Sequence, residues 1–89
     1  MKRYYIIVSG RVQGVGFRYF CLKTARQCQL TGWVKNQTNG TVALEVQGKE
    51  ANLSLFIQTL RQGDRFIRVD DYQIKQLELA DDNDFKIRY

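Results

Sequence analysis

Two glycines and an arginine lie close together in the segment GRVQGVGFRYF, residues 10–20, where β-branched residues give way to aromatic ones. Gly14 and Gly16 can adopt the positive φ angles that turn successive backbone N–H groups toward one point. If a helix begins directly after them, its first N–H groups lack acceptors and lie at the positive end of the helix dipole. Such a loop can bind an anion, phosphate in particular. The candidate phosphate-binding residues, through their backbone N–H groups, are Gln13, Gly14, Val15, Gly16, Phe17 and Arg18.

Arg18 falls in the first turn of this expected helix, where the dipole favours acidic side chains. A cation there costs about a few tenths of a kcal/mol unless an anion lies nearby. Its planar guanidinium matches the oxygens of a phosphate group, so we expect Arg18 to complete the anion site. A solvated arginine on the helix surface is the alternative interpretation.

The residue types that are missing limit the chemistry of such a site. The chain has no histidine, and neither cysteine has the C-x₅-R spacing of a thiol phosphatase. Water is then the expected nucleophile, and without a general acid the leaving group must depart as a stable anion. A mixed carboxylic–phosphoric anhydride, an acyl phosphate, meets this condition, whereas a phosphate monoester does not.

An attacking water needs a polar side chain to orient it, and Asn36 is the candidate. It ends a short predicted strand, just before a turn. Asparagines at such positions often form turns or caps, and that interpretation stays open. Spacing alone does not establish that Asn36 reaches the glycine-rich loop.

Hydrophobic periodicity predicts the elements that must position these residues. Strands are predicted at residues 4–9, 31–36, 41–47, 67–79 and 85–89, helices at 17–28 and 50–62, and a glycine-rich loop at 10–16. The pair Asn39-Gly40 is the strongest hairpin signal in the chain. The apolar alternation slips between Ile74 and Leu77, which predicts a β-bulge between them.

The order strand, helix, strand, strand, helix, strand predicts an α+β fold of the split βαβ, ferredoxin-like type. Both helices are expected on one face of an antiparallel sheet, with a short extra C-terminal strand. A chain of 89 residues allows one domain, residues 1–89.

The net charge and the hydropathy of the chain limit the kinds of molecule that it is expected to bind. The net charge of +5 suits an anionic ligand, but there is no run of lysine and arginine typical of nucleic-acid-binding tails. No apolar stretch approaches the ~20 residues that span a bilayer, and we read the N-terminus as a strand, so a cytoplasmic protein without a membrane partner is expected.

Cys21 and Cys28 would lie ~10 Å apart on one helix, too far for a disulfide, and are expected in the core. Two thiols without a histidine also make a poor metal site, so no metal is expected.

RNA binding is a tempting alternative, because QGVGFRYF at residues 13–20 resembles the octamer of an RNA-recognition domain with this fold. The octamer there occupies a strand, whereas here the segment begins a helix whose aromatic side chains would face the core. We therefore expect no nucleic-acid partner.

Two segments of the chain resemble the signatures of the acylphosphatase family. GRVQGVGFRYF is similar to G-x-V-Q-G-V-x-F-R, and GWVKNQTNGTV at residues 32–42 is similar to G-W-V-x-N-x-x-x-G-x-V. The similarity continues through VQG at 46–48 to the terminal IRY. It therefore covers nearly the whole chain, with both signatures in the family's order.

The resemblance implies hydrolysis of acyl phosphates to a carboxylate and phosphate, without metal or cofactor. A monomer is expected. By motif position, Arg18 resembles the family's phosphate-binding arginine, Asn36 its water-orienting asparagine, and residues 13–17 its phosphate cradle. Inorganic phosphate or sulfate would compete with the substrate. In some members the terminal carboxylate rests against this arginine, which suggests a pairing of the Tyr89 carboxylate with Arg18.

One segment departs from the family pattern. GDRFIRVD, residues 63–70, has no proline, so the conformation of residues 63–68 does not follow from the resemblance. The alternative function is a non-catalytic module of the same fold that binds a phosphorylated ligand.

Overall fold

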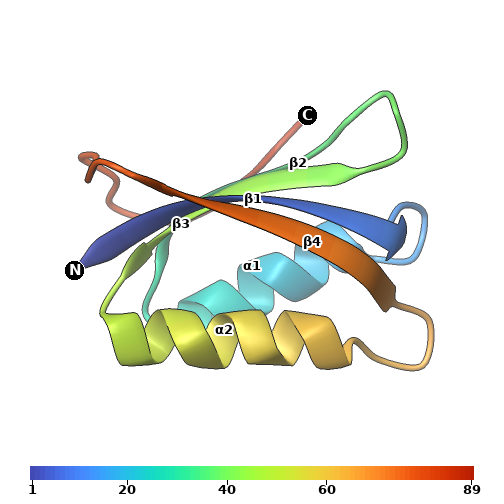
Figure 1. Cartoon of the computed structure of the whole chain (residues 1–89), viewed down its shortest axis with the longest axis horizontal. Helices are drawn as coiled ribbons and strands as arrows, with labels where there is room; N and C mark the ends of the chain where they lie inside the picture. Colours follow the sequence, from blue (N-terminus) through green and yellow to red (C-terminus); the bar gives the residue numbers. More distant parts are fainter.

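The computed structural model describes all 89 residues as two layers, a five-stranded sheet and two helices (Figure 1). In chain order the elements are β1 (Lys2–Arg11), α1 (Phe17–Gln27), β2 (Thr31–Asn36), β3 (Val42–Gly48), α2 (Glu50–Gln62), β4 (Arg68–Leu77) and β5 (Phe85–Arg88). Their order is the predicted one, and both helices begin at the predicted residue. β1 is longer than predicted at both ends, which shortens the glycine-rich loop to residues 12–16.

The strand order in the sheet is β4-β1-β3-β2-β5, with β3 at the centre and β4 and β5 at the edges. The first four strands pair antiparallel, as predicted. β5 pairs with β2 in parallel, so the complete sheet is mixed rather than wholly antiparallel. Its register opposes Lys35 and Arg88, and this pairing carries the next residues of the two strands, Asn36 and Tyr89, to the same end of the sheet.

Both helices cover one face of the sheet, as predicted (Figure 1). The 3.6-residue period of α1 turns Phe17, Cys21 and Ala25 into the core, and the alternation of β3 does the same for Val42 and Leu44. Burial of each larger apolar side chain contributes about 1.5–3 kcal/mol. Neither helix has the length and apolarity needed to cross a membrane.

The predicted bulge between Ile74 and Leu77 is wrong. β4 keeps its register with β1 there, from Ile6 opposite Ile74 to Arg3 opposite Leu77. Strict alternation turns Leu77 toward the face of the sheet that carries no helix, which accounts for the slip in apolar parity. The register shift lies nearer the start of β4, where Asp70 is the extra residue between the partners of Ser9 and Gly10.

A buried arginine on the uncovered face holds the segment that leads into β5. Arg3 is only 3% exposed, and its guanidinium lies 2.8 Å from Glu45 Oε1 and 2.8 Å from Asp82 Oδ2. Burial disfavours its charge, but the hydrogen bond to Glu45 and the ion pair with Asp82 outweigh that effect and raise the pKa of Arg3. The Gln47 side chain adds two hydrogen bonds to the Ala80 backbone. These contacts fix the chain just before β5 and so help to set the position of the C-terminus.

The side chain of Asp64 organises residues 63–68, the segment after α2 whose conformation did not follow from the resemblance. Asp64 Oδ1 accepts hydrogen bonds from the N–H groups of Phe66 and Ile67. Ile67 packs into the core and Phe66 is exposed. The side chain of Asp64 thus shapes the turn in a segment that has no proline.

Both cysteines are free and buried, in agreement with the helical period. Burial raises the pKa of the Cys21 thiol and of the Cys28 thiol. Neither is therefore a thiolate near neutral pH. We expect the folded protein to react with a disulfide reagent such as DTNB at pH 8 about 10²-fold or more slowly than the unfolded chain. Rapid native-state reaction of Cys21 in a Cys28→Ala variant would contradict this.

Candidate active site

The glycine-rich loop, residues 12–16, and the start of α1 present a run of free backbone donors. None of the N–H groups of residues 13–19 donates a hydrogen bond within the structure. The first one that does belongs to Phe20, which donates to the Gly16 carbonyl at 3.0 Å. α1 also has neither a side-chain cap nor an acidic residue in its first turn. Nothing in the protein therefore neutralises this positive helix end, and an anion can bind there.

Two glycines give the loop its shape. Gly14 has φ 73° and Gly16 has φ 79°, both in the left-handed region. A Cβ atom at either position would meet no other atom within 4 Å, so the requirement is backbone conformation and not space. A residue with a side chain would cost roughly 1–2 kcal/mol at each position. The glycines thus allow the free N–H groups to occupy neighbouring positions on a tight turn.

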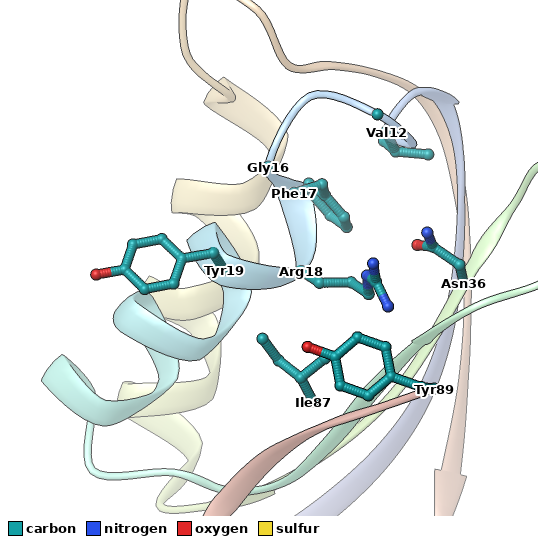
Figure 2. Close-up of a pocket in the computed structure, with 9 residues that line it drawn as sticks. Val12, Gly16, Phe17, Arg18, Tyr19, Asn36, Ile87 and Tyr89 are labelled. Atoms are coloured by element: carbon teal, nitrogen blue, oxygen red, sulfur yellow. The ribbon is translucent and has the colours of Figure 1, made fainter.

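A pocket of about 300 Å³ opens beside this loop. The side chains of Arg18 from α1 and Asn36 from β2 point toward one another across it (Figure 2). The lining residues are Val12, Gly14, Gly16, Phe17, Arg18, Tyr19, Asn36, Ile87 and Tyr89. The structure thus brings Arg18, Asn36 and most of the predicted loop residues together. Gln13 and Val15 do not line the pocket.

The Asn36 side chain carries an unsatisfied polar atom into the site. Its Oδ1 atom is buried and has no hydrogen-bond partner. The adjacent turn is built without it, because Asn39 Oδ1 accepts the Thr41 N–H and Gln37 N–H donates to the Thr41 carbonyl. Asn36 is therefore not the turn residue of the alternative interpretation. A buried acceptor without a donor costs about 1–3 kcal/mol, and a water or substrate in the pocket would remove that cost.

The C-terminal residue contacts Arg18 through its ring rather than its carboxylate. The Arg18 guanidinium carbon lies 4.8 Å from the centroid of the Tyr89 ring, and the terminal carboxylate forms no ion pair with it. The parallel pairing of β5 with β2 explains the contact, because it delivers Tyr89 beside Asn36 and the pocket (Figure 2). The suggested carboxylate pairing is thus replaced by a cation–π contact.

Loss of this ring contact should have a modest effect. An exposed cation–π pair contributes about 0.5–1 kcal/mol, so Tyr89→Ala should lower kcat/KM for an acyl phosphate by about two- to fivefold. Tyr89→Phe, which keeps the ring, should retain most of the wild-type value. Equal losses for the two variants, measured side by side, would contradict a role for the ring.

The sequence did not indicate several of the residues around the pocket. Val12, Ile87 and Tyr19 line it, but apolar and aromatic types at such spacing are ordinary core or surface residues. The Gln13 side chain also has an unforeseen contact, since Nε2 donates to the carbonyl oxygens of Gln37 and Thr41. No group of three or more histidine, cysteine, aspartate or glutamate side chains is arranged to hold a metal ion.

Comparison with known proteins identifies the family of this chain. The sequence model of the family described as Acylphosphatase matches residues 4–87. A curated acylphosphatase of Geobacillus kaustophilus (strain HTA426) is 50% identical over 100% of this chain and 96% of its own length. One from Clostridium acetobutylicum (strain ATCC 824) is 49% identical over 100% and 99%, respectively.

A solved structure has the same fold over the full length. The crystal structure of acylphosphatase from Bacillus subtilis superimposes with a TM-score of 0.96 at 41% identity, and each chain is covered completely. The family match covers nearly the whole chain, and the relatives and the solved structure cover all of it. This chain belongs to the acylphosphatase family.

Proposed function

We propose that this acylphosphatase holds the phosphoryl group of its substrate with Arg18 and the N–H groups of residues 13–18. Water then attacks phosphorus while the bond from phosphorus to the carboxyl oxygen breaks. The products are a carboxylate and inorganic phosphate, and the proton lost by the water ends on the phosphate. No side chain has to donate a proton to the leaving group, because a carboxylate is a stable anion.

The observation that carries this proposal is the row of N–H groups without acceptors that lies next to the guanidinium. In phosphoryl transfer, negative charge is spread over the equatorial oxygens, and catalysis consists mainly of positioning and charge stabilisation. Donors that are already oriented need no rearrangement when that charge develops. A tight turn of free N–H groups and one guanidinium supply both functions.

Asn36 is proposed to orient the water. Its unpartnered Oδ1 can accept a hydrogen bond from water, and its amide faces Arg18 across the pocket (Figure 2). A water held there lies between the amide and the bound phosphoryl group. The buried, unpartnered oxygen of Asn36 would thus be satisfied by the nucleophile itself.

Hydrolysis of benzoyl phosphate, followed by loss of absorbance and by phosphate release, tests the proposal. We expect turnover without added metal and competitive inhibition by inorganic phosphate or sulfate. Phosphate binding without any hydrolysis would support the alternative, a module that only binds a phosphorylated ligand. Neither binding nor turnover would contradict both functions.

The proposal also covers the oligomeric state of the enzyme and its cellular compartment. Arg18, Asn36 and the free N–H groups already meet within one folded chain, and we propose that the monomer is active. Free thiols at Cys21 and Cys28 are typical of a reducing compartment, which supports the cytoplasm.

A further inference from the structure

The Gln13 side chain connects the glycine-rich loop, residues 12–16, to the loop that follows Asn36. Gln13 Nε2 lies 2.8 Å from the Gln37 carbonyl oxygen and 2.8 Å from the Thr41 carbonyl oxygen. An amide nitrogen has two hydrogens, and each carbonyl accepts one of them. Because both partners are acceptors, the orientation of the amide is unambiguous: its nitrogen, and not its oxygen, faces the turn.

The two acceptors are also the groups that close the β2–β3 hairpin. The Gln37 carbonyl accepts the Gly40 N–H at 3.1 Å, and the Thr41 carbonyl accepts the Gln37 N–H at 2.9 Å. Gln13 therefore takes the remaining lone pair of each carbonyl. It binds a turn that backbone hydrogen bonds already close, directly after Asn36 in the chain.

Nothing else ties the glycine-rich loop to this hairpin by hydrogen bonds. Residues 12–16 donate no backbone hydrogen bond, and the only carbonyl among them that accepts one is that of Gly16, within its own helix. Apart from that bond to α1, the Gln13 side chain makes the only hydrogen bonds between the loop and the rest of the chain. Gln13 itself is exposed and does not line the pocket.

We propose that Gln13 is a positioning residue that fixes the distance between the phosphate-binding N–H groups and Asn36. The inference rests on the proposed function and adds to it a side-chain role distinct from the Gln13 backbone donor. Arg18 and the free N–H groups belong to one continuous segment and hold phosphate without the link. The water on Asn36 comes from another strand, so its alignment with phosphorus depends on the link between the two loops.

Loss of the link should therefore affect turnover more than binding. A misplacement of about 1 Å can cost 10²-fold in rate, and we expect Gln13→Ala to lower kcat by about 10- to 100-fold. The inhibition constant for inorganic phosphate should stay within about threefold of wild type. Gln13→Glu keeps the size but puts a carboxylate against two carbonyl oxygens, so it should lose at least as much. The matched control is Gln58→Ala, because Gln58 is exposed and its side chain makes no hydrogen bond.

A double-mutant cycle decides whether Gln13 acts through Asn36. In an Asn36→Ala background, the further loss of kcat caused by Gln13→Ala should fall to less than about twofold. Equal losses in both backgrounds would overturn the proposal, as would a phosphate affinity that falls as far as kcat. Amide NMR spectra with and without inorganic phosphate check that each variant is folded and still binds at residues 13–18. If the wild type itself did not hydrolyse benzoyl phosphate, the proposed function would fail instead, and the two failures are thus distinguishable.

Discussion

Arg18→Ala should reduce kcat/KM for benzoyl phosphate by about 10³-fold or more, because one guanidinium on a transferring phosphoryl group contributes 10³–10⁵ in rate. Arg18 is the only charged side chain that lines the pocket. Its removal leaves the N–H groups of residues 13–18 as the sole donors to a doubly charged group. Affinity for inorganic phosphate should fall together with turnover, since the same contact stabilises the bound ground state.

Two further variants serve as controls, one for the shape of the guanidinium and one for the loss of a positive charge elsewhere. Arg18→Lys keeps the positive charge but loses the planar fork, so a large part of the defect should remain. Arg65→Ala removes an exposed arginine that lies over the Phe66 ring, forms no ion pair and does not line the pocket, and it should behave as wild type. Near-wild-type hydrolysis by Arg18→Ala would refute the assignment of the site.

Asn36→Ala should lower kcat by about 10²–10³-fold, the usual cost of losing one oriented polar group at a reacting centre. Unlike Arg18, Asn36 is proposed to contact the water and not the phosphoryl oxygens. The inhibition constant for inorganic phosphate should therefore change by less than about threefold. Steady-state kinetics with phosphate as the inhibitor gives both quantities in one experiment.

The matched control for this variant is Asn83→Ala, which changes an exposed asparagine before β5 that does not line the active-site pocket. Truncation of Asn36 also removes a buried unpartnered oxygen, so the variant should be at least as stable as wild type toward thermal unfolding. A parallel loss of phosphate affinity and turnover would show that Asn36 binds the phosphoryl group and does not act through water.

Local sequence patterns were enough to predict much of the fold. The apolar period of α1, the alternation of β3 and the Asn39-Gly40 turn each depend on neighbours within a few residues, which is why they could be predicted. The relative positions of Arg18 and Asn36 could not be predicted from local patterns. They lie on separate elements, and spacing alone could not establish their meeting; the resemblance to known signatures supplied that expectation.

Most features that escaped prediction depend on pairing between distant segments. The parallel direction of β5 follows from the crossing to the far edge of the sheet, and it replaces the expected carboxylate contact of Tyr89 with a ring contact. The register shift at Asp70 is set by the partner strand β1. The Gln13 link spans 24 and 28 residues to its two acceptors. No periodicity within a strand or loop encodes such contacts.

The most direct test of the central claim is a titration of the ¹⁵N-labelled protein with inorganic phosphate, followed by amide NMR. We predict saturable shifts concentrated on the N–H groups of residues 13–18 and on the Arg18 Nε–H, with much smaller shifts elsewhere. Saturable binding that leaves these resonances unmoved, or that moves a different surface, would contradict the account.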